Sequence, residues 1–60
     1  MTALKRGLDA TAFADMAAFL GMEPEATVYE IVATYRLAES DARELVTLAY
    51  DERALLEEGQ

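Results

Sequence analysis

Few side chains of this 60-residue chain are suited to chemistry near neutral pH. Histidine and cysteine are absent, so acid–base work would fall to the twelve carboxylates and three tyrosines. The only serine, Ser40, has no histidine to activate it, and the neighbouring carboxylates Asp51 and Glu52 point in different directions on a helix. Thiolate and imidazole metal ligands are also missing. We therefore expect no enzyme, no cofactor and no dedicated metal site.

Charge and size restrict the partners. The net charge is −7, and because Lys5 and Arg6 are the only charged residues of 1–8, residues 9–60 carry −9. An acidic surface repels phosphate backbones and anionic lipid, so nucleic acid and membrane are unfavourable partners. Alternatively, the charge serves solubility alone, or it complements a basic protein or imitates nucleic acid. Asp9 and Asp15 interrupt the apolar segment that a signal peptide would need, which predicts a cytoplasmic protein.

The pattern predicts one all-α domain over residues 1–60, with helices at 9–20, 24–38 and 41–58. Sixty residues without a disulfide make a marginal monomer, so we expect a small three-helix bundle or a helical hairpin completed by oligomerisation. Gly21 suits the left-handed position that ends a helix, and Pro24 suits a first helical residue. Residues 2–8 are expected to form at most a frayed turn, with Asp9 or Thr11 capping the first helix.

Each predicted helix has an apolar side. The buried residues expected in 9–20 are Ala12, Phe13, Met16, Ala17, Phe19 and Leu20. Those expected in 24–38 are Val28, Ile31, Val32, Tyr35 and Ala38, with Thr27, Glu30 and Thr34 at a polar edge. A second apolar strip of the same helix comprises Ala26, Tyr29, Ala33 and Leu37. Since a helix of a small bundle needs one buried face, this strip predicts a partner surface. A strand over 27–37 is the competing interpretation.

The third helix is expected to start after Ser40 as its N-cap and to bury Leu45, Leu48, Ala49, Leu55 and Leu56. Glu39 and Arg43 have the spacing of a helical ion pair, which would also suit one continuous rod through Ser40. Glu52 falls within the apolar stripe. It lies either at the wet edge of the core or in a pair with Arg36, Arg43 or a tyrosine hydroxyl. We predict the pair, with a role in fixing the register of an interface.

The segment from Phe13 to Tyr35 resembles a DNA-binding helix-turn-helix. Met16, Ala17, Leu20, Gly21 and Met22 occupy the positions of its first-helix, turn and following core residues. The resemblance implies a recognition helix after the turn. This chain departs from the pattern at Thr27, where the first apolar anchor belongs. The would-be recognition face also carries Glu25, Glu30 and Thr34, without arginine, lysine, asparagine or glutamine to read bases.

These observations favour a non-catalytic protein–protein interaction module, such as the small regulatory, inhibitory or assembly subunits found among phage and bacterial accessory proteins. The expected partner is another protein or a second copy of the chain, through Tyr29, Ala33, Leu37 and Glu52. The alternatives are a helix-turn-helix transcriptional regulator and an acidic mimic of nucleic acid that inhibits a DNA-binding protein.

Overall fold

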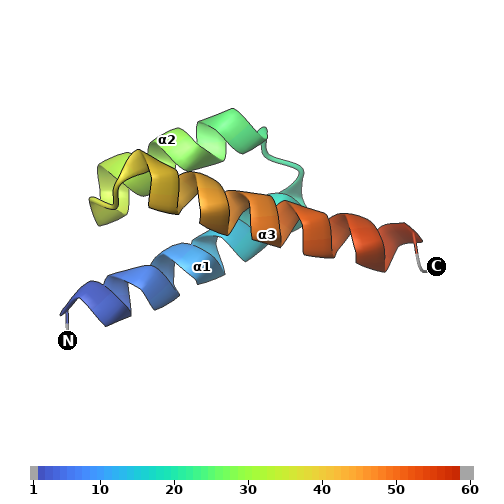
Figure 1. Cartoon of the computed structure of the whole chain (residues 1–60). Helices are drawn as coiled ribbons and strands as arrows, with labels where there is room; N and C mark the ends of the chain where they lie inside the picture. The colour runs from blue at the N-terminus through green and yellow to red at the C-terminus, as the bar shows by residue number, and fades with distance from the viewer. Residues whose placement is uncertain (1, 59–60) are drawn as a thin grey trace.

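Between Thr2 and Glu58 the fold consists of three helices, each of which packs against the other two (Figure 1). A computed structural model describes the backbone of residues 2–58 and the side chains of residues 7–57. The helices are α1 (Thr2–Leu20), α2 (Pro24–Tyr35) and α3 (Glu39–Glu58). The all-α prediction is therefore confirmed, in its three-helix form. Within residues 2–58, no helix has both the length and the apolarity needed to cross a bilayer.

The first helix is longer than the sequence predicted. It begins at Thr2 and continues through Gly7, so the expected start at residue 9 is wrong. A glycine inside a helix costs only about 1 kcal/mol relative to alanine, which the surrounding helical residues can offset. Neither Asp9 nor Thr11 is a cap; the Thr11 hydroxyl donates to the Gly7 carbonyl one turn earlier, at 2.8 Å.

The turn between α1 and α2 has the predicted chemistry. Gly21 adopts a left-handed conformation, with φ of 80°. Its N–H donates to the Ala18 carbonyl at 3.3 Å, and the N–H of Met22 donates to the Ala17 carbonyl at 2.9 Å. This pair of bonds is a Schellman motif, which satisfies two carbonyls at the end of α1. Pro24 then starts α2, as expected.

The second connection was not foreseen. The second helix ends at Tyr35, where Arg36 turns the chain with left-handed angles of φ 57° and ψ 38°. The predicted extension of this helix to Ala38 is therefore wrong. The structure also rules out the two alternatives, a continuous rod through Ser40 and a strand over 27–37. Ser40 is no N-cap either, because α3 already begins at Glu39 and continues to Glu58. Left-handed angles disfavour residues with a side chain, so an arginine at this position gives no local sequence signal for the turn.

The core is made chiefly of alanine. Among residues 7–57, the buried hydrophobic residues are Ala10, Ala14, Ala17, Val28, Ile31, Ala42, Val46 and Ala49. Five of the eight are alanines, whose small side chains let the helices approach closely. The buried side of α2 was predicted correctly at Val28 and Ile31, with Val32 and Tyr35 packed against the core.

The faces expected to be buried in α1 and α3 were mostly wrong, because their large residues were assumed to form the core. Met16, Phe19 and Leu20 of α1 are exposed, as are Leu48, Leu55 and Leu56 of α3. The prediction for Thr27 was also wrong, but in the opposite sense. It was assigned to the polar edge of α2 but is fully buried.

Candidate functional site

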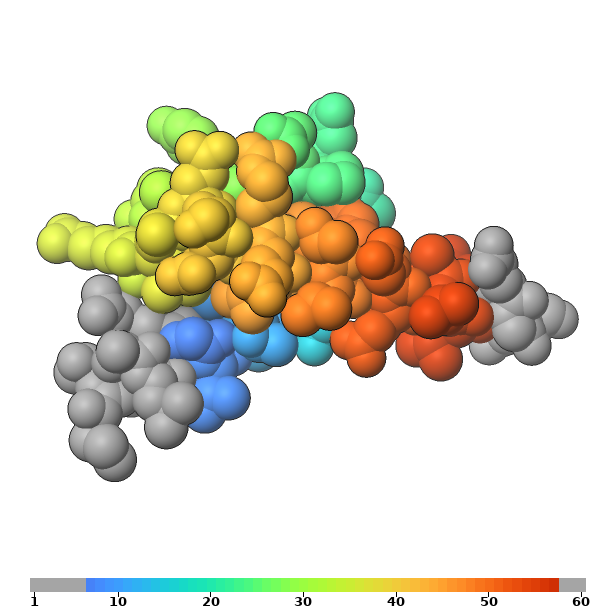
Figure 2. Space-filling view, viewed as in Figure 1, coloured from blue at the N-terminus to red at the C-terminus, as the bar shows by residue number. Residues whose placement is uncertain are grey.

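The surface of this chain carries many large apolar side chains. Eight of them, all in residues 7–57, are more than half exposed: Leu8, Met16, Phe19, Leu20, Tyr29, Leu48, Leu55 and Leu56. They come from all three helices, but α1 and α3 contribute seven. Figure 2 shows α3 lying across α1 on one face of the molecule, with its last turns projecting beyond the other helices. The apolar surface is therefore concentrated on the two helices that cross there.

The four residues predicted for an interface do not form one patch. Tyr29 and Ala33 lie one turn apart on the exposed side of α2, and Tyr29 is 73% exposed. Leu37 follows the end of α2, where it packs partly buried against the core. It lines a hollow between α1 and α3. Glu52 is exposed and lines a second hollow between the same two helices.

Two separate hollows lie between α1 and α3, and together we call them the α1–α3 groove. The first has a volume of about 350 Å³ and is lined by Gly7, Leu37, Asp41, Glu44, Leu45 and Leu48. The second has a volume of about 220 Å³ and is lined by Asp15, Ala49, Glu52, Arg53 and Leu56. Each lining residue of the second hollow lies eight positions after a lining residue of the first. On α1, Asp15 follows Gly7; on α3, the residues that correspond to Asp41, Glu44, Leu45 and Leu48 are Ala49, Glu52, Arg53 and Leu56. Since residues four apart form continuous ridges on a helix, the same ridges line both hollows.

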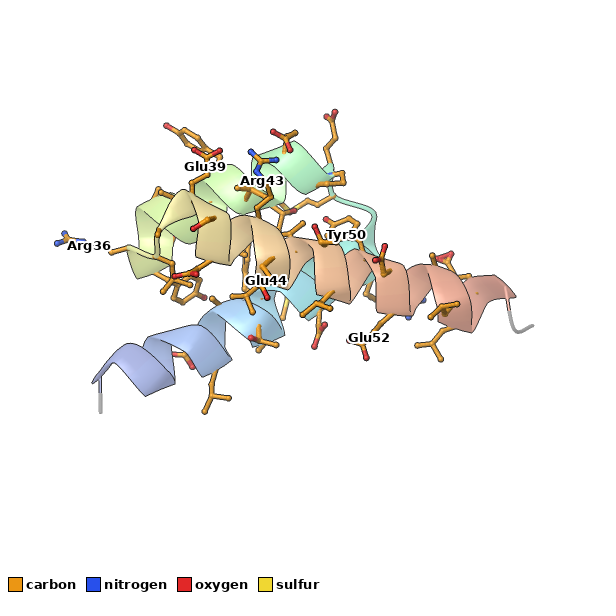
Figure 3. The ribbon with its side chains drawn as sticks, in the orientation of Figure 1. Arg36, Glu39, Arg43, Glu44, Tyr50 and Glu52 are labelled. Atoms are coloured by element: carbon orange, nitrogen blue, oxygen red, sulfur yellow. The ribbon has the colours of Figure 1, made fainter. Side chains whose placement is uncertain are left out.

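The outer ridge of the groove alternates carboxylate and leucine. Its members are Glu44, Leu48, Glu52 and Leu56, each four residues after the last. Figure 3 shows Glu44 and Glu52 on the side of α3 toward α1, whereas Glu39 and Arg43 lie on the side toward α2. This spacing is visible in the sequence, but the large leucines were assigned to the core and the ridge was missed.

The α1–α3 groove is negatively charged. Its lining includes four carboxylates, from Asp15, Asp41, Glu44 and Glu52, and one guanidinium, from Arg53, which gives a net charge of −3. The guanidinium is already engaged. Its Cζ lies 4.7 Å from the centre of the Phe19 ring, and its Nε lies 3.7 Å from the Glu57 carboxylate. The groove therefore exposes leucines beside carboxylates, and the negative charges of these carboxylates outnumber the one positive charge in its lining.

The ion pair predicted for Glu52 does not form. Arg43 instead donates from both amino groups to Glu25 and also contacts Glu39 at 2.9 Å. The contact with Glu39 confirms the helical pair expected from the sequence. Among the ion pairs of the described residues, none includes Glu52. The buried face of α3 is rotated relative to the prediction, which places Glu52 in solvent.

A separate hollow between α2 and α3 contains the Arg43 cluster. It has a volume of about 410 Å³ and is lined by Glu25, Val28, Tyr29, Val32, Glu39 and Arg43. The hydrogen bonds and charge of Arg43 lower the pKa of Glu25 below its ordinary value. Reciprocally, Glu25 and Glu39 raise the pKa of Arg43. Because these charges neutralise one another locally, this hollow offers a partner less unpaired charge than the α1–α3 groove.

Metal coordination has no candidate in the part of the chain that the structure describes, since no three Asp or Glu side chains there are arranged around a common point. No protein-family model, curated protein or solved structure matches this chain.

Proposed function

We propose that the chain is a non-catalytic protein–protein interaction module. The observation that carries this proposal is the inverted distribution of apolar residues, with alanines in the core and large side chains outside. Phe19, Leu20 and Leu55 are each about two-thirds exposed, whereas most of the buried hydrophobic residues within 7–57 are alanines. Burying a large apolar side chain stabilises a protein by about 1.5–3 kcal/mol. A partner that covers these side chains would supply free energy that the alanine-rich core does not.

Site-specific photo-crosslinking tests this proposal. A photoreactive phenylalanine analogue would replace Phe19, Leu55 or, as a control, the exposed Thr34 of α2, in the cells that produce the protein. We expect protein adducts from the two apolar positions and few from the control position. Absence of adducts above the control level, together with a monomeric mass by light scattering, would contradict the proposal.

A helix-turn-helix regulator is the second candidate, and the turn between α1 and α2 favours it. Gly21 is left-handed, and Thr27, six residues later, occupies a buried position as the motif requires. The charge of α2 and its N-cap is unfavourable, since Glu23, Glu25 and Glu30 are exposed and would face phosphate. Tight binding to one duplex sequence at physiological salt, unaffected by competitor DNA, would favour this candidate over an interaction module.

A further inference from the structure

We propose that the α1–α3 groove binds a basic amphipathic helix of another protein. This inference rests on the proposed function and names the surface and the chemistry of the partner. The two hollows of the groove offer Leu45, Leu48 and Leu56 to apolar side chains. Their borders offer the carboxylates of Asp15, Asp41, Glu44 and Glu52 to cations. A helix with apolar residues on one side and lysine or arginine beside them complements both features.

The spacing of the hollows matches a helix. Equivalent residues of the two hollows are eight positions apart on α3, a distance of ~12 Å along the helix axis. On a bound helix that runs along α3, the same distance separates side chains about two turns apart. The partner is therefore expected to carry apolar anchors at positions i and i+7 or i+8, with basic residues on the flanks.

The charges of the groove favour such a partner over a second copy of this chain. In a closed two-fold dimer with α3 packed antiparallel on its counterpart and centred at Leu48, Glu44 of one copy would face Glu52 of the other, twice. In a parallel arrangement each of these carboxylates would face itself. Like charges across an interface destabilise it, and Arg53 is already occupied by Phe19 and Glu57. In any two-fold pairing of this surface, the net charge of −3 on the groove would meet its own copy, so electrostatic complementarity favours a basic partner.

The test uses two synthetic helical peptides of about five turns with the same leucine stripe, one with lysine and the other with glutamate at all remaining positions. Binding to the intact protein is measured by isothermal titration calorimetry, at low salt and at high salt. We expect the leucine–lysine peptide to bind, with an affinity that falls as salt rises, and the leucine–glutamate peptide not to bind.

Two charge-matched variants locate the site. The groove variant combines Glu44→Gln with Glu52→Gln. The control variant combines Glu23→Gln, at the exposed N-cap of α2, with Glu30→Gln on the exposed side of that helix. Both remove two negative charges, so a general attraction to an acidic protein would weaken equally in both. We expect the groove variant to bind the leucine–lysine peptide about tenfold more weakly, while the control variant stays within about twofold. Circular dichroism verifies that each variant keeps its helicity.

A third variant, Leu48→Ser, tests the apolar part of the groove at a side chain that is 57% exposed. It should weaken binding at both salt concentrations. Equal weakening by the groove and control variants, or equal binding of the two peptides, would overturn the proposal. If ultracentrifugation shows a dimer that Leu48→Ser converts to a monomer, the partner of the groove is a second copy of this chain and not a basic helix. That result would leave the interaction function intact, whereas failure of the crosslinking experiment would contradict the function itself.

Discussion

The Tyr50 hydroxyl lies 2.9 Å from the Thr27 hydroxyl, so that α3 is joined to the first turn of α2 by two side chains that the sequence did not pair. Tyr50 also donates to the Met22 carbonyl at 2.6 Å, and the Thr27 hydroxyl lies 3.1 Å from the Glu23 carbonyl. The Glu23 carbonyl already accepts from the Thr27 N–H. Since each hydroxyl has one hydrogen, the arrangement that satisfies all groups is a chain from Thr27 to Tyr50 to Met22.

This chain of hydrogen bonds predicts coupling between the two hydroxyls. Tyr50→Phe should lower the free energy of unfolding by about 1–2 kcal/mol, because it leaves the Met22 carbonyl without the Tyr50 donor and the Thr27 hydroxyl with only the Glu23 carbonyl as a partner. Thr27→Val alone should also destabilise the protein, and the double variant should lose less than the sum of the two single losses. Urea unfolding of the four proteins measures the coupling. Strictly additive losses would show that the two hydroxyls act independently.

The two described glycines should respond oppositely to the same substitution. Gly7 lies inside α1 and Gly21 is left-handed, and a Cβ at either position would meet no atom within 4 Å. Gly7→Ala should therefore stabilise the protein by about 0.5–1 kcal/mol through helix propensity. Gly21→Ala should destabilise it by about 1 kcal/mol, since its positive φ disfavours a side chain. Thermal unfolding measures both, and a shift of the same sign in both variants would refute this account of the turn.

The ion pair of Glu25 with Arg43 predicts a dependence of stability on pH. The folded state lowers the pKa of Glu25 because Arg43 donates hydrogen bonds to the carboxylate and attracts its charge. A carboxylate with a lowered pKa stabilises the fold above its unfolded pKa of about 4.3, and this contribution is lost as the pH falls through the folded pKa. Glu25→Gln should therefore lower Tm at neutral pH and lower it less in acid. Glu30→Gln on the same helix serves as the control, and an equal shift from both variants at neutral pH would contradict the prediction.

Replacement of Glu52 should leave stability almost unchanged. The side chain is exposed and no ion pair of the described residues includes it, so Glu52→Gln and Glu52→Leu should each change the free energy of unfolding by less than about 0.5 kcal/mol. A buried pair would instead lose about 3–5 kcal/mol when one partner is removed. Thermal unfolding of both variants distinguishes these outcomes. A large loss of stability in both variants would contradict the exposed position of Glu52 and indicate that it is buried.

Substitutions of Leu37 and Tyr29, at the two ends of the predicted α2 surface, should have different effects on stability in thermal unfolding. Leu37 packs against the core and Tyr29 is 73% exposed. Leu37→Glu should cost about 1–3 kcal/mol, because it places a charge beside apolar atoms in a partly buried position. Tyr29→Glu should change stability by less than about 0.5 kcal/mol. If Leu37→Glu is as harmless as Tyr29→Glu, Leu37 does not belong to the packed part of the molecule.

The sequence by itself determined the features that depend on local chemistry. A left-handed glycine and a proline at the first helical position mark the turn between α1 and α2, and both act within a few residues of themselves. The buried side of α2 could be predicted because its valine and isoleucine residues have helical spacing. The ion pair of Glu39 with Arg43 follows from the same spacing. These predictions needed no knowledge of how the helices pack.

Only the tertiary structure decided which faces of α1 and α3 are buried. Alanine and leucine both count as apolar in a sequence pattern, but Ala10, Ala14 and Ala42 allow a close helix contact that larger side chains would prevent. The packing of these alanines turns the leucines outward, exposes Glu52 and creates the α1–α3 groove. The hydroxyl pair of Thr27 with Tyr50 likewise arises from a contact between residues distant in the chain. Local propensity has no information about such contacts, so the candidate site emerged only once the helices were in place.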